Sequence, residues 1–213
     1  MSTAPAGASP DRRHRVAVLL SGRGSNFLAL HEAAARGRLP AEIALVVCNE
    51  PTAPGLERAR ELGLPTALLP HRGEPSRAAH EEKVLAELHA AGAEWICLAG
   101  YMRLLSASFV GAWRERILNI HPSLLPLYRG LHPQRQALAA GAKESGCTVH
   151  FVDEGLDSGP IVLQRRVPVL PDDDERSLAA RILEQEHRAY PEALARLLSE
   201  AWHVEDSRVV FGS

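Results

Sequence analysis

The chain has 213 residues, of which 46% are hydrophobic and 23% charged, with a formal net charge of −2 and a pI of about 6.6. This length suits one ordinary domain or a domain with a small appendage, and the composition excludes bulk disorder. The weakly acidic balance argues against a protein that binds nucleic acid through its general field.

The sequence carries no signal for export or for a membrane. Residues 1–13 are rich in small residues and proline and lack the apolar run of a secretory signal, so we expect a loose tail. No apolar stretch approaches the length of a membrane span. Cys48, Cys97 and Cys147 show no CxxC spacing and are interpreted as small core residues in a reducing compartment. We therefore expect a soluble, cytoplasmic protein.

Apolar runs alternate with helical patterns over the first part of the chain. Helices are predicted at 25–36, 54–62, 76–90 (with Ser76 as its cap) and 106–112, and strands at 16–20, 43–48, 66–69, 95–99 and 117–120. Strands that alternate with helices predict a parallel sheet with helices on both faces.

The regular alternation of strands and helices ends after the predicted strand at 117–120. A helix is expected at 132–140, strands at 148–152 and 161–169 around the loop "DEGLDSG", and a final strand or hairpin at 203–211. Residues 173–201 are expected to form a long helix that Pro191 kinks or interrupts. The predicted fold class is α/β: a Rossmann-like, mostly parallel twisted sheet with antiparallel strands toward the C-terminal part.

No metal site is predicted. The sequence has no HExxH motif and no clustered His/Cys spacing. The acidic run from Asp172 to Glu175 is interpreted as a solvated helix start, because carboxylates suit the positive end of a helix.

The loop "LLSGRGSN", residues 19–26, joins the first predicted strand to the first predicted helix. Gly22 and Gly24 would let the backbone approach a ligand, and the amides at the helix start favour an anion. The spacing fits neither the dinucleotide nor the P-loop motif, so a lone phosphate monoester is preferred. A tight turn capped by Ser or Asn is one alternative, and a dinucleotide site using Glu50 is another.

Polar residues end the predicted strand at 117–120. Asn119 and His121 would point to the same face at the carboxyl end of a parallel strand, where open α/β sheets place their sites. Asp157, in a glycine-bracketed turn, could add a carboxylate. Amide, imidazole and carboxylate together suit acyl transfer to a substrate amine. Ser123 lacks the GxSxG setting of a nucleophile.

Six segments read in order resemble the glycinamide ribonucleotide formyltransferase family, over about residues 15–200. They are "VAVLLSGRGSN", "CLAGYMRLLS", "LNIHPSLLP", "LHPQRQAL", "GCTVHFVDEGLDSGPIVLQ" and "EQEHRAYPEAL". The resemblance implies formyl transfer from 10-formyltetrahydrofolate to the amine of glycinamide ribonucleotide in purine biosynthesis. It also implies one formyltransferase domain over 14–213, with a phosphate-binding half at 14–115 and a catalytic and folate-binding half at 116–213.

The resemblance also implies which residues act. The catalytic set matches Asn119, His121 and Asp157. The ribonucleotide side matches Glu186, for the glycinamide end, and the loop residues Gly22, Arg23, Gly24, Ser25 and Asn26. The folate side matches Arg77, Met102, Arg103, Leu104, Leu105, Val110 and Asn119, with a loop of Asp153, Glu154, Gly155, Leu156 and Asp157 closing round the pterin. The expected partners are these two small molecules, without nucleic acid or membrane, in a monomer or homodimer.

The sequence departs from the family pattern in "GLHPQ", where Pro133 and Gln134 follow His132. The Asn, His and Asp of the catalytic set are shared with formyltransferases that act on methionyl-tRNA or nucleotide sugars, so they do not decide the acceptor. The core also resembles formyltetrahydrofolate hydrolase. The glycine loop and the chain length favour glycinamide ribonucleotide. An amino-sugar nucleotide as acceptor, or a non-catalytic phosphate- or nucleotide-binding module, are the alternatives.

Overall fold

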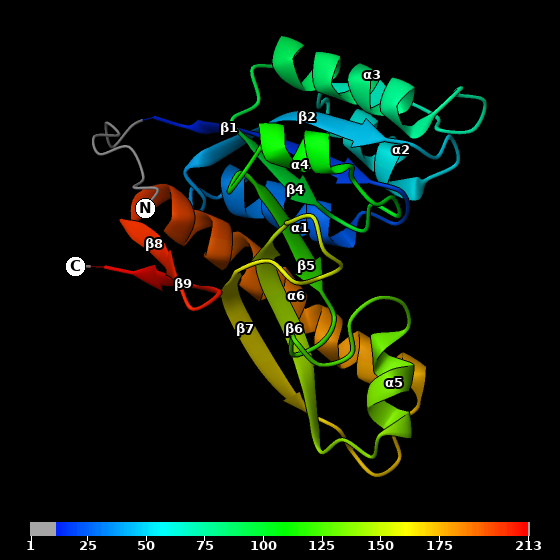
Figure 1. Ribbon diagram of the computed structural model, residues 1–213, viewed down its shortest axis with the longest axis vertical. Helices are drawn as coiled ribbons and strands as arrows, with labels where there is room; N and C mark the ends of the chain where they lie inside the picture. The colour runs from blue at the N-terminus through cyan, green and yellow to red at the C-terminus, as the bar shows by residue number, and fades with distance from the viewer. Residues whose placement is uncertain (1–11, 213) are drawn as a thin grey trace. The chain divides into compact units, whose positions relative to one another are not determined.

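The computed structural model describes residues 12–212, which form two compact units that meet in sequence between Leu118 and Asn119 (Figure 1). The loose tail predicted for residues 1–13 lies, up to residue 11, outside the described residues. The functional halves expected on either side of residue 115 stay a prediction.

Parallel strands form the centre of the first unit. They are β1 (His14–Leu20), β2 (Ala41–Cys48), β3 (Thr66–Leu68) and β4 (Trp95–Leu98), in the order β3-β2-β1-β4. All three pairings are parallel. Every residue from Val16 to Leu20 is completely buried, as expected for a strand covered on both faces. The carboxyl ends of these strands therefore share one edge of the sheet.

The helices of the first unit begin where the sequence predicts. They are α1 (Ser25–Ala35), α2 (Pro54–Glu61), α3 (Arg77–Ala90) and α4 (Ala107–Ala112). Ser76 caps α3 by accepting from the Ala79 N–H at 3.1 Å, and Pro54 is the first residue of α2. Figure 1 shows α1 and α3 on opposite sides of the strands, as right-handed crossovers in opposite directions require.

The second unit mixes parallel and antiparallel pairing. Its elements are β5 (Ile117–His121, which starts in the last residues of the first unit), α5 (Pro133–Ala139), β6 (Glu144–Phe151), β7 (Ile161–Pro168), α6 (Glu175–Ser199), β8 (Trp202–Glu205) and β9 (Arg208–Phe211), with the strand order β5-β6-β7-β9-β8. β6 and β7 pair antiparallel, as do β8 and β9. The predicted fold class is confirmed.

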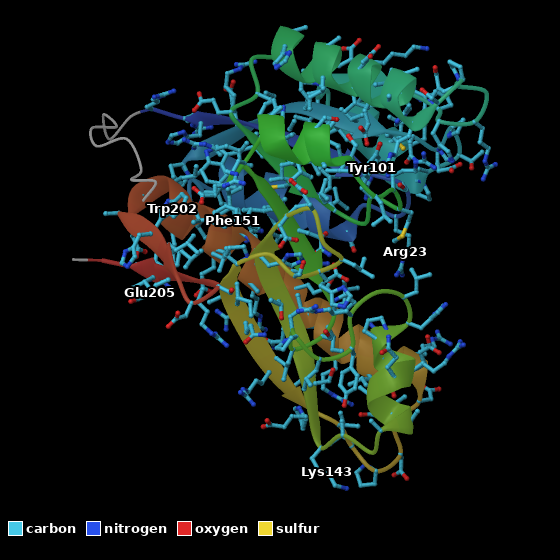
Figure 2. The ribbon with its side chains drawn as sticks, viewed as in Figure 1. Arg23, Tyr101, Lys143, Phe151, Trp202 and Glu205 are labelled. Carbon is cyan, nitrogen blue, oxygen red and sulfur yellow. The ribbon has the colours of Figure 1, made fainter. Side chains whose placement is uncertain are left out.

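The last two strands form the hairpin predicted as one possibility for residues 203–211. Asp206 and Ser207, in its turn, have φ angles of 46° and 59°, the left-handed values that two-residue hairpin turns favour. The Trp202 and Phe151 rings lie together, with centroids 5.3 Å apart, and anchor the hairpin to β6 (Figure 2).

The prediction placed the start of β6 too late. The strand begins at Glu144, four residues before the expected start. Gly146 resembles a turn residue, yet it pairs with Arg166 of β7, and a Cβ at Gly146 would lie 2.0 Å from the Arg165 carbonyl oxygen. Glycine is needed here for close approach of two strands, a use that its sequence neighbours do not reveal.

Of the two predicted effects of Pro191, the interruption is wrong, because α6 runs through it, and the kink stays a prediction. Proline cannot donate to the carbonyl four residues earlier, which normally destabilises a helix interior. Tyr190, Ala193 and Leu194 are completely buried around it, and α6 packs on β6 and β7. Tertiary packing therefore overrides the local preference.

The three cysteines and the acidic run before α6 agree with the predictions. Cys48, Cys97 and Cys147 are free and buried, as predicted. Asp174 is the N-cap of α6 and forms a reciprocal capping box with Ser177, so the acidic run is a helix start. Among residues 12–212, no helix is long and apolar enough to cross a membrane.

Candidate active site

An imidazole and a carboxylate from distant parts of the sequence meet in the second unit. The Nδ1 atom of His121, at the end of β5, lies 3.5 Å from Oδ2 of Asp157. The Nε2 atom of His121 lies 2.9 Å from the carbonyl oxygen of Tyr128. A carbonyl only accepts, so Nε2 carries a proton, and the contact with Asp157 is favourable when Nδ1 is protonated too. The geometry therefore suits a charged imidazole beside a carboxylate.

Asp157 lies in the loop after β6, and its carboxylate is held by Gly130 of the loop before α5. The Gly130 N–H donates to its Oδ2 at 2.9 Å, and the side chain is only 11% exposed. Asp153 accepts from the Gly155 N–H at 3.1 Å and from the Ser158 hydroxyl at 2.8 Å, so the loop is folded by its own hydrogen bonds. The Asp157 carboxylate is thus fixed before any ligand arrives.

His150 of β6, which was not among the predicted site residues, lies beside both Asn119 and Asp157. Its Nδ1 donates to the carbonyl of Phe151 at 2.8 Å, and its Nε2 lies 3.3 Å from Nδ2 of Asn119 and 3.7 Å from Oδ1 of Asp157. Burial lowers the pKa of His150, which favours the neutral ring. With its proton on Nδ1, the neutral ring accepts a hydrogen bond from Asn119 through Nε2. The signal in the sequence was a histidine inside a predicted buried strand.

Ser123 is a structural residue. It is completely buried, its hydroxyl donates to the Leu127 carbonyl, and its own carbonyl accepts from the Thr148 hydroxyl at 2.7 Å. A hydroxyl that is buried and already donating is poorly suited to attack a substrate.

In the first unit, the glycine loop leads from β1 into α1. Gly24 is the N-cap of α1 with φ 73°, and the helix start has neither a side-chain cap nor an acidic residue in its first turn. The Gly55 N–H donates to the Gly22 carbonyl at 3.0 Å, and a Cβ at Gly24 would lie 2.9 Å from the Gly55 Cα. Arg23 projects from the loop and is exposed (Figure 2). The loop is therefore a close-packed turn as well as an uncapped helix start that favours an anion.

Glu50 does not resemble a ribose-binding acid. Its carboxylate lies 3.6 Å from the Arg72 guanidinium and 3.9 Å from Nδ1 of His71. The exposed Arg72 guanidinium is therefore a cationic partner for the carboxylate on which the dinucleotide alternative depends.

The residues matched to folate in the first unit include large exposed apolar side chains. Met102 is 73% exposed and Leu104 is 68% exposed, while Val110 is buried in α4. The buried Glu81 of α3 accepts from the Ser106 N–H at 2.8 Å. Arg77 lies one helical turn before Glu81, so this bond brings the start of α3 to the segment containing Met102 and Leu104.

The other matched residues lie in the second unit. Glu186 is buried in α6 near Cys147, whose pKa is raised to about 12 by burial and, to a lesser extent, by the negative charge of Glu186. Residues Glu154, Gly155 and Leu156 are exposed in the loop that ends at Asp157. Within residues 12–212, no cluster of three or more His, Cys, Asp or Glu side chains could hold a metal ion.

A family model described as "Formyl transferase" matches residues 14–194. The chain belongs to this formyl transferase family. The match covers elements of both units, including the glycine loop, Asn119, His121 and Asp157.

Relatives within the formyl transferase family are closely similar. The chain is 44% identical to the phosphoribosylglycinamide formyltransferase of Escherichia coli over 176 residues, which cover 83% of each protein. It is 54% identical over 191 residues to the trifunctional purine biosynthetic protein adenosine-3 of Drosophila melanogaster. That alignment covers 88% of this chain and spans only 14% of the length of the fly protein.

A solved formyl transferase has the same fold. The chain resembles glycinamide ribonucleotide transformylase 1 from Symbiobacterium toebii with a TM-score of 0.91 and 45% identity. The similarity covers 94% of this chain and 95% of that one. This likeness supports the α/β architecture over nearly the whole chain.

Proposed function

We propose that this chain transfers the formyl group of 10-formyltetrahydrofolate to the amine of glycinamide ribonucleotide, in de novo purine biosynthesis. The names of the E. coli and S. toebii relatives support this acceptor. The observation that carries the chemistry is the contact of His121 with a carboxylate, Asp157, that the Gly130 N–H already holds.

The reaction forms a tetrahedral centre, and the proposed residues match its needs. The amine attacks the formyl carbon, and negative charge develops on the formyl oxygen. The second Nδ2 proton of Asn119 and the Nε2 proton of His121 are the proposed donors to that oxygen. Since Nε2 of His121 donates to the Tyr128 carbonyl in this structure, the oxyanion would replace that carbonyl as acceptor.

Asp157 has two proposed tasks. Its charge stabilises the imidazolium of His121, and it accepts, directly or through water, the proton that the attacking amine must lose. The C–N bond to the amine forms, the bond to the folate nitrogen breaks, and that nitrogen receives a proton. Formylated ribonucleotide and tetrahydrofolate are the products.

The binding roles are proposed from the family resemblance. Gly22, Arg23, Gly24, Ser25 and Asn26 hold the phosphate, at the uncapped start of α1. Glu186 holds the glycinamide end. The folate contacts are Asn119 with Arg77, Met102, Arg103, Leu104, Leu105 and Val110, and the loop Asp153–Asp157. The proposed partners are these two small molecules, and the monomer or homodimer state stays a prediction.

An acceptor assay tests the proposal. Purified protein is mixed with 10-formyltetrahydrofolate and either glycinamide ribonucleotide or an amino-sugar nucleotide, and tetrahydrofolate formation is followed. We expect turnover with the ribonucleotide and none with the sugar. Turnover with the sugar alone would reverse the acceptor, and binding of both ligands without turnover would favour a non-catalytic module.

The Asp157→Asn variant tests the catalytic role of Asp157 in the same assay. An amide oxygen can still accept from the Gly130 N–H, while the negative charge beside His121 is lost. We expect kcat to fall on the order of a hundredfold or more. An unchanged kcat would remove Asp157 from the mechanism.

A further inference from the structure

Ser21 stands at the end of β1, directly before the glycine loop, and the proposed mechanism does not use it. The parallel ladder between β1 and β4 continues past the last residue of β4: the Ala99 N–H donates to the Leu19 carbonyl at 2.8 Å, and the Ser21 N–H donates to the Gly100 carbonyl at 3.1 Å. At Gly100, with φ 74°, the chain turns away. Two residues later, the Met102 N–H donates to the Ser21 hydroxyl at 2.8 Å. A side chain thus replaces a backbone acceptor at the end of the ladder.

The direction of this hydrogen bond is fixed by its neighbours. A backbone N–H can only donate, so the Ser21 oxygen accepts from Met102, and its own proton goes to Oδ1 of Asn49 at 2.6 Å. Asn49 is 2% exposed, and its Nδ2 lies 3.0 Å from Nδ1 of His71, to which it donates. The buried Asn49 amide, which is itself hydrogen-bonded to His71, therefore fixes the orientation of the Ser21 hydroxyl.

The segment that follows, residues 102–106, is held by hydrogen bonds at both of its ends. Ser21 holds its start at Met102, and Glu81 holds its end by accepting from the N–H and the hydroxyl of Ser106. Within the described part of the chain, residues 103–105 make no backbone-to-backbone hydrogen bond to any other residue. Their N–H and C=O groups remain available to the polar edge of a flat heterocycle, beside the exposed Met102 and Leu104 side chains.

We propose that Ser21 is a positioning residue for folate: its hydroxyl, oriented by Asn49, sets the backbone of residues 102–105 against the end of β1. Glu81 is the matching residue at the far end of the segment. The inference rests on the proposed folate role of residues 102–105. Preorganised backbone groups bind a rigid ring more tightly because less ordering is left to binding.

Equilibrium binding tests this role. The dissociation constants of tetrahydrofolate, the product that binds without turnover, and of glycinamide ribonucleotide are measured by calorimetry for the wild-type protein and for Ser21→Ala, Ser21→Thr and Glu81→Gln. For Ser21→Ala we expect the tetrahydrofolate constant to rise about tenfold, because the hydrogen bonds to Met102 and to Asn49 are both lost and the segment is less ordered before it binds. The ribonucleotide constant should change less than about twofold, since the glycine loop keeps its own contacts.

Rescue and failure are distinguishable. Ser21→Thr keeps a hydroxyl and should restore tetrahydrofolate binding, and Glu81→Gln should weaken it in the same direction as Ser21→Ala. A purely structural role would weaken both ligands equally, and that result would overturn the inference, as would unchanged binding of tetrahydrofolate. If the wild-type protein binds no tetrahydrofolate at all, the proposed function fails instead. Should Ser21→Ala not fold, Ser21→Cys, whose thiol is a weaker acceptor for the Met102 N–H, takes its place with the same expected and overturning results.

Discussion

The Asn119 amide has two Nδ2 protons, and His150 decides where one of them points. The Nε2 atom of the neutral His150 ring lies 3.3 Å from Nδ2 and accepts a hydrogen bond from one of the two N–H groups. The other N–H group is then left to donate to a reacting oxygen. A donor oriented in advance costs little reorganisation when charge develops, which is the main source of such stabilisation. We therefore interpret His150 as a positioning residue for Asn119.

Two amide substitutions separate the contacts of His150. His150→Gln can place an oxygen near the Nε2 position and still accept from Asn119, whereas His150→Asn can imitate only the Nδ1 donor to the Phe151 carbonyl. We expect His150→Asn to lower kcat about tenfold more than His150→Gln does, the effect of one lost hydrogen bond. Steady-state kinetics at saturating substrates measure the difference. Equal losses in the two variants would show that orientation of Asn119 by His150 is unimportant.

Alanine substitutions at Gly24 and Gly22 distinguish the packing role of the glycine loop from its proposed role in phosphate binding. Gly24→Ala puts a Cβ 2.9 Å from the Gly55 Cα at a φ of 73°, and we expect it to destabilise the fold by about 1–3 kcal/mol. At Gly22 a Cβ would meet nothing within 4 Å, so Gly22→Ala should change stability by less than about 0.5 kcal/mol. Urea unfolding measures both. A raised KM for the ribonucleotide is therefore informative only in the Gly22 variant.

Helix α3 depends on one side chain for its start. It has no acidic residue in its first turn, and the Ser76 hydroxyl accepts from the Ala79 N–H. The end of α3 near Ser76 carries Arg77, one of the proposed folate contacts. Fraying of this first turn would therefore disturb a proposed ligand contact as well as the helix.

Removal of this cap gives a stability prediction for the element. Ser76→Ala should cost about 1 kcal/mol and lower Tm by about 2–4 °C for a chain of this size. Ser76→Asp, which keeps an acceptor and adds charge at the positive helix end, should match or exceed the wild-type Tm. Differential scanning calorimetry makes the comparison. If Ser76→Ala and Ser76→Asp melted together below the wild type, the capping bond would not be the cause.

The stability of the whole molecule should depend on pH through the buried His150 and the half-buried His187. Burial lowers the pKa of His150 and of His187. The unfolded chain protonates these rings near their ordinary pKa of about 6.5, while the folded chain keeps them neutral. Below that pH the unfolded state binds more protons than the folded state, so the free energy of unfolding falls as pH falls.

Urea unfolding between pH 7.5 and about 5 tests this dependence. We expect the wild-type free energy of unfolding to decrease over this range, and the decrease to be smaller in His187→Gln and His150→Gln. His203→Gln, at an exposed position in β8, is the control for the substitution itself. A steeper loss in the His187 or His150 variants would contradict the sign of the argument.

The sequence by itself determined the features that depend on neighbouring residues. Periodicity placed the strands and helices, and Pro54 and Ser76 marked helix starts that the structure confirms. The types of the candidate site residues, Asn119, His121 and Asp157, were also visible, because they stand at ends of strands and in a glycine-bracketed turn. Backbone hydrogen bonds and caps act over a few residues, so a short window of sequence contains them.

Only the tertiary structure decided which groups meet and which atom donates. Three hydrogen bonds illustrate this: Gly130 to Asp157, Asn119 to His150, and Met102 to the Ser21 hydroxyl. Their partners lie 27, 31 and 81 positions apart in the sequence. The same holds for Gly146 inside a strand and for Pro191 inside a helix. Such contacts depend on how whole elements pack and on which polar groups burial leaves to be paired, and no local pattern specifies either.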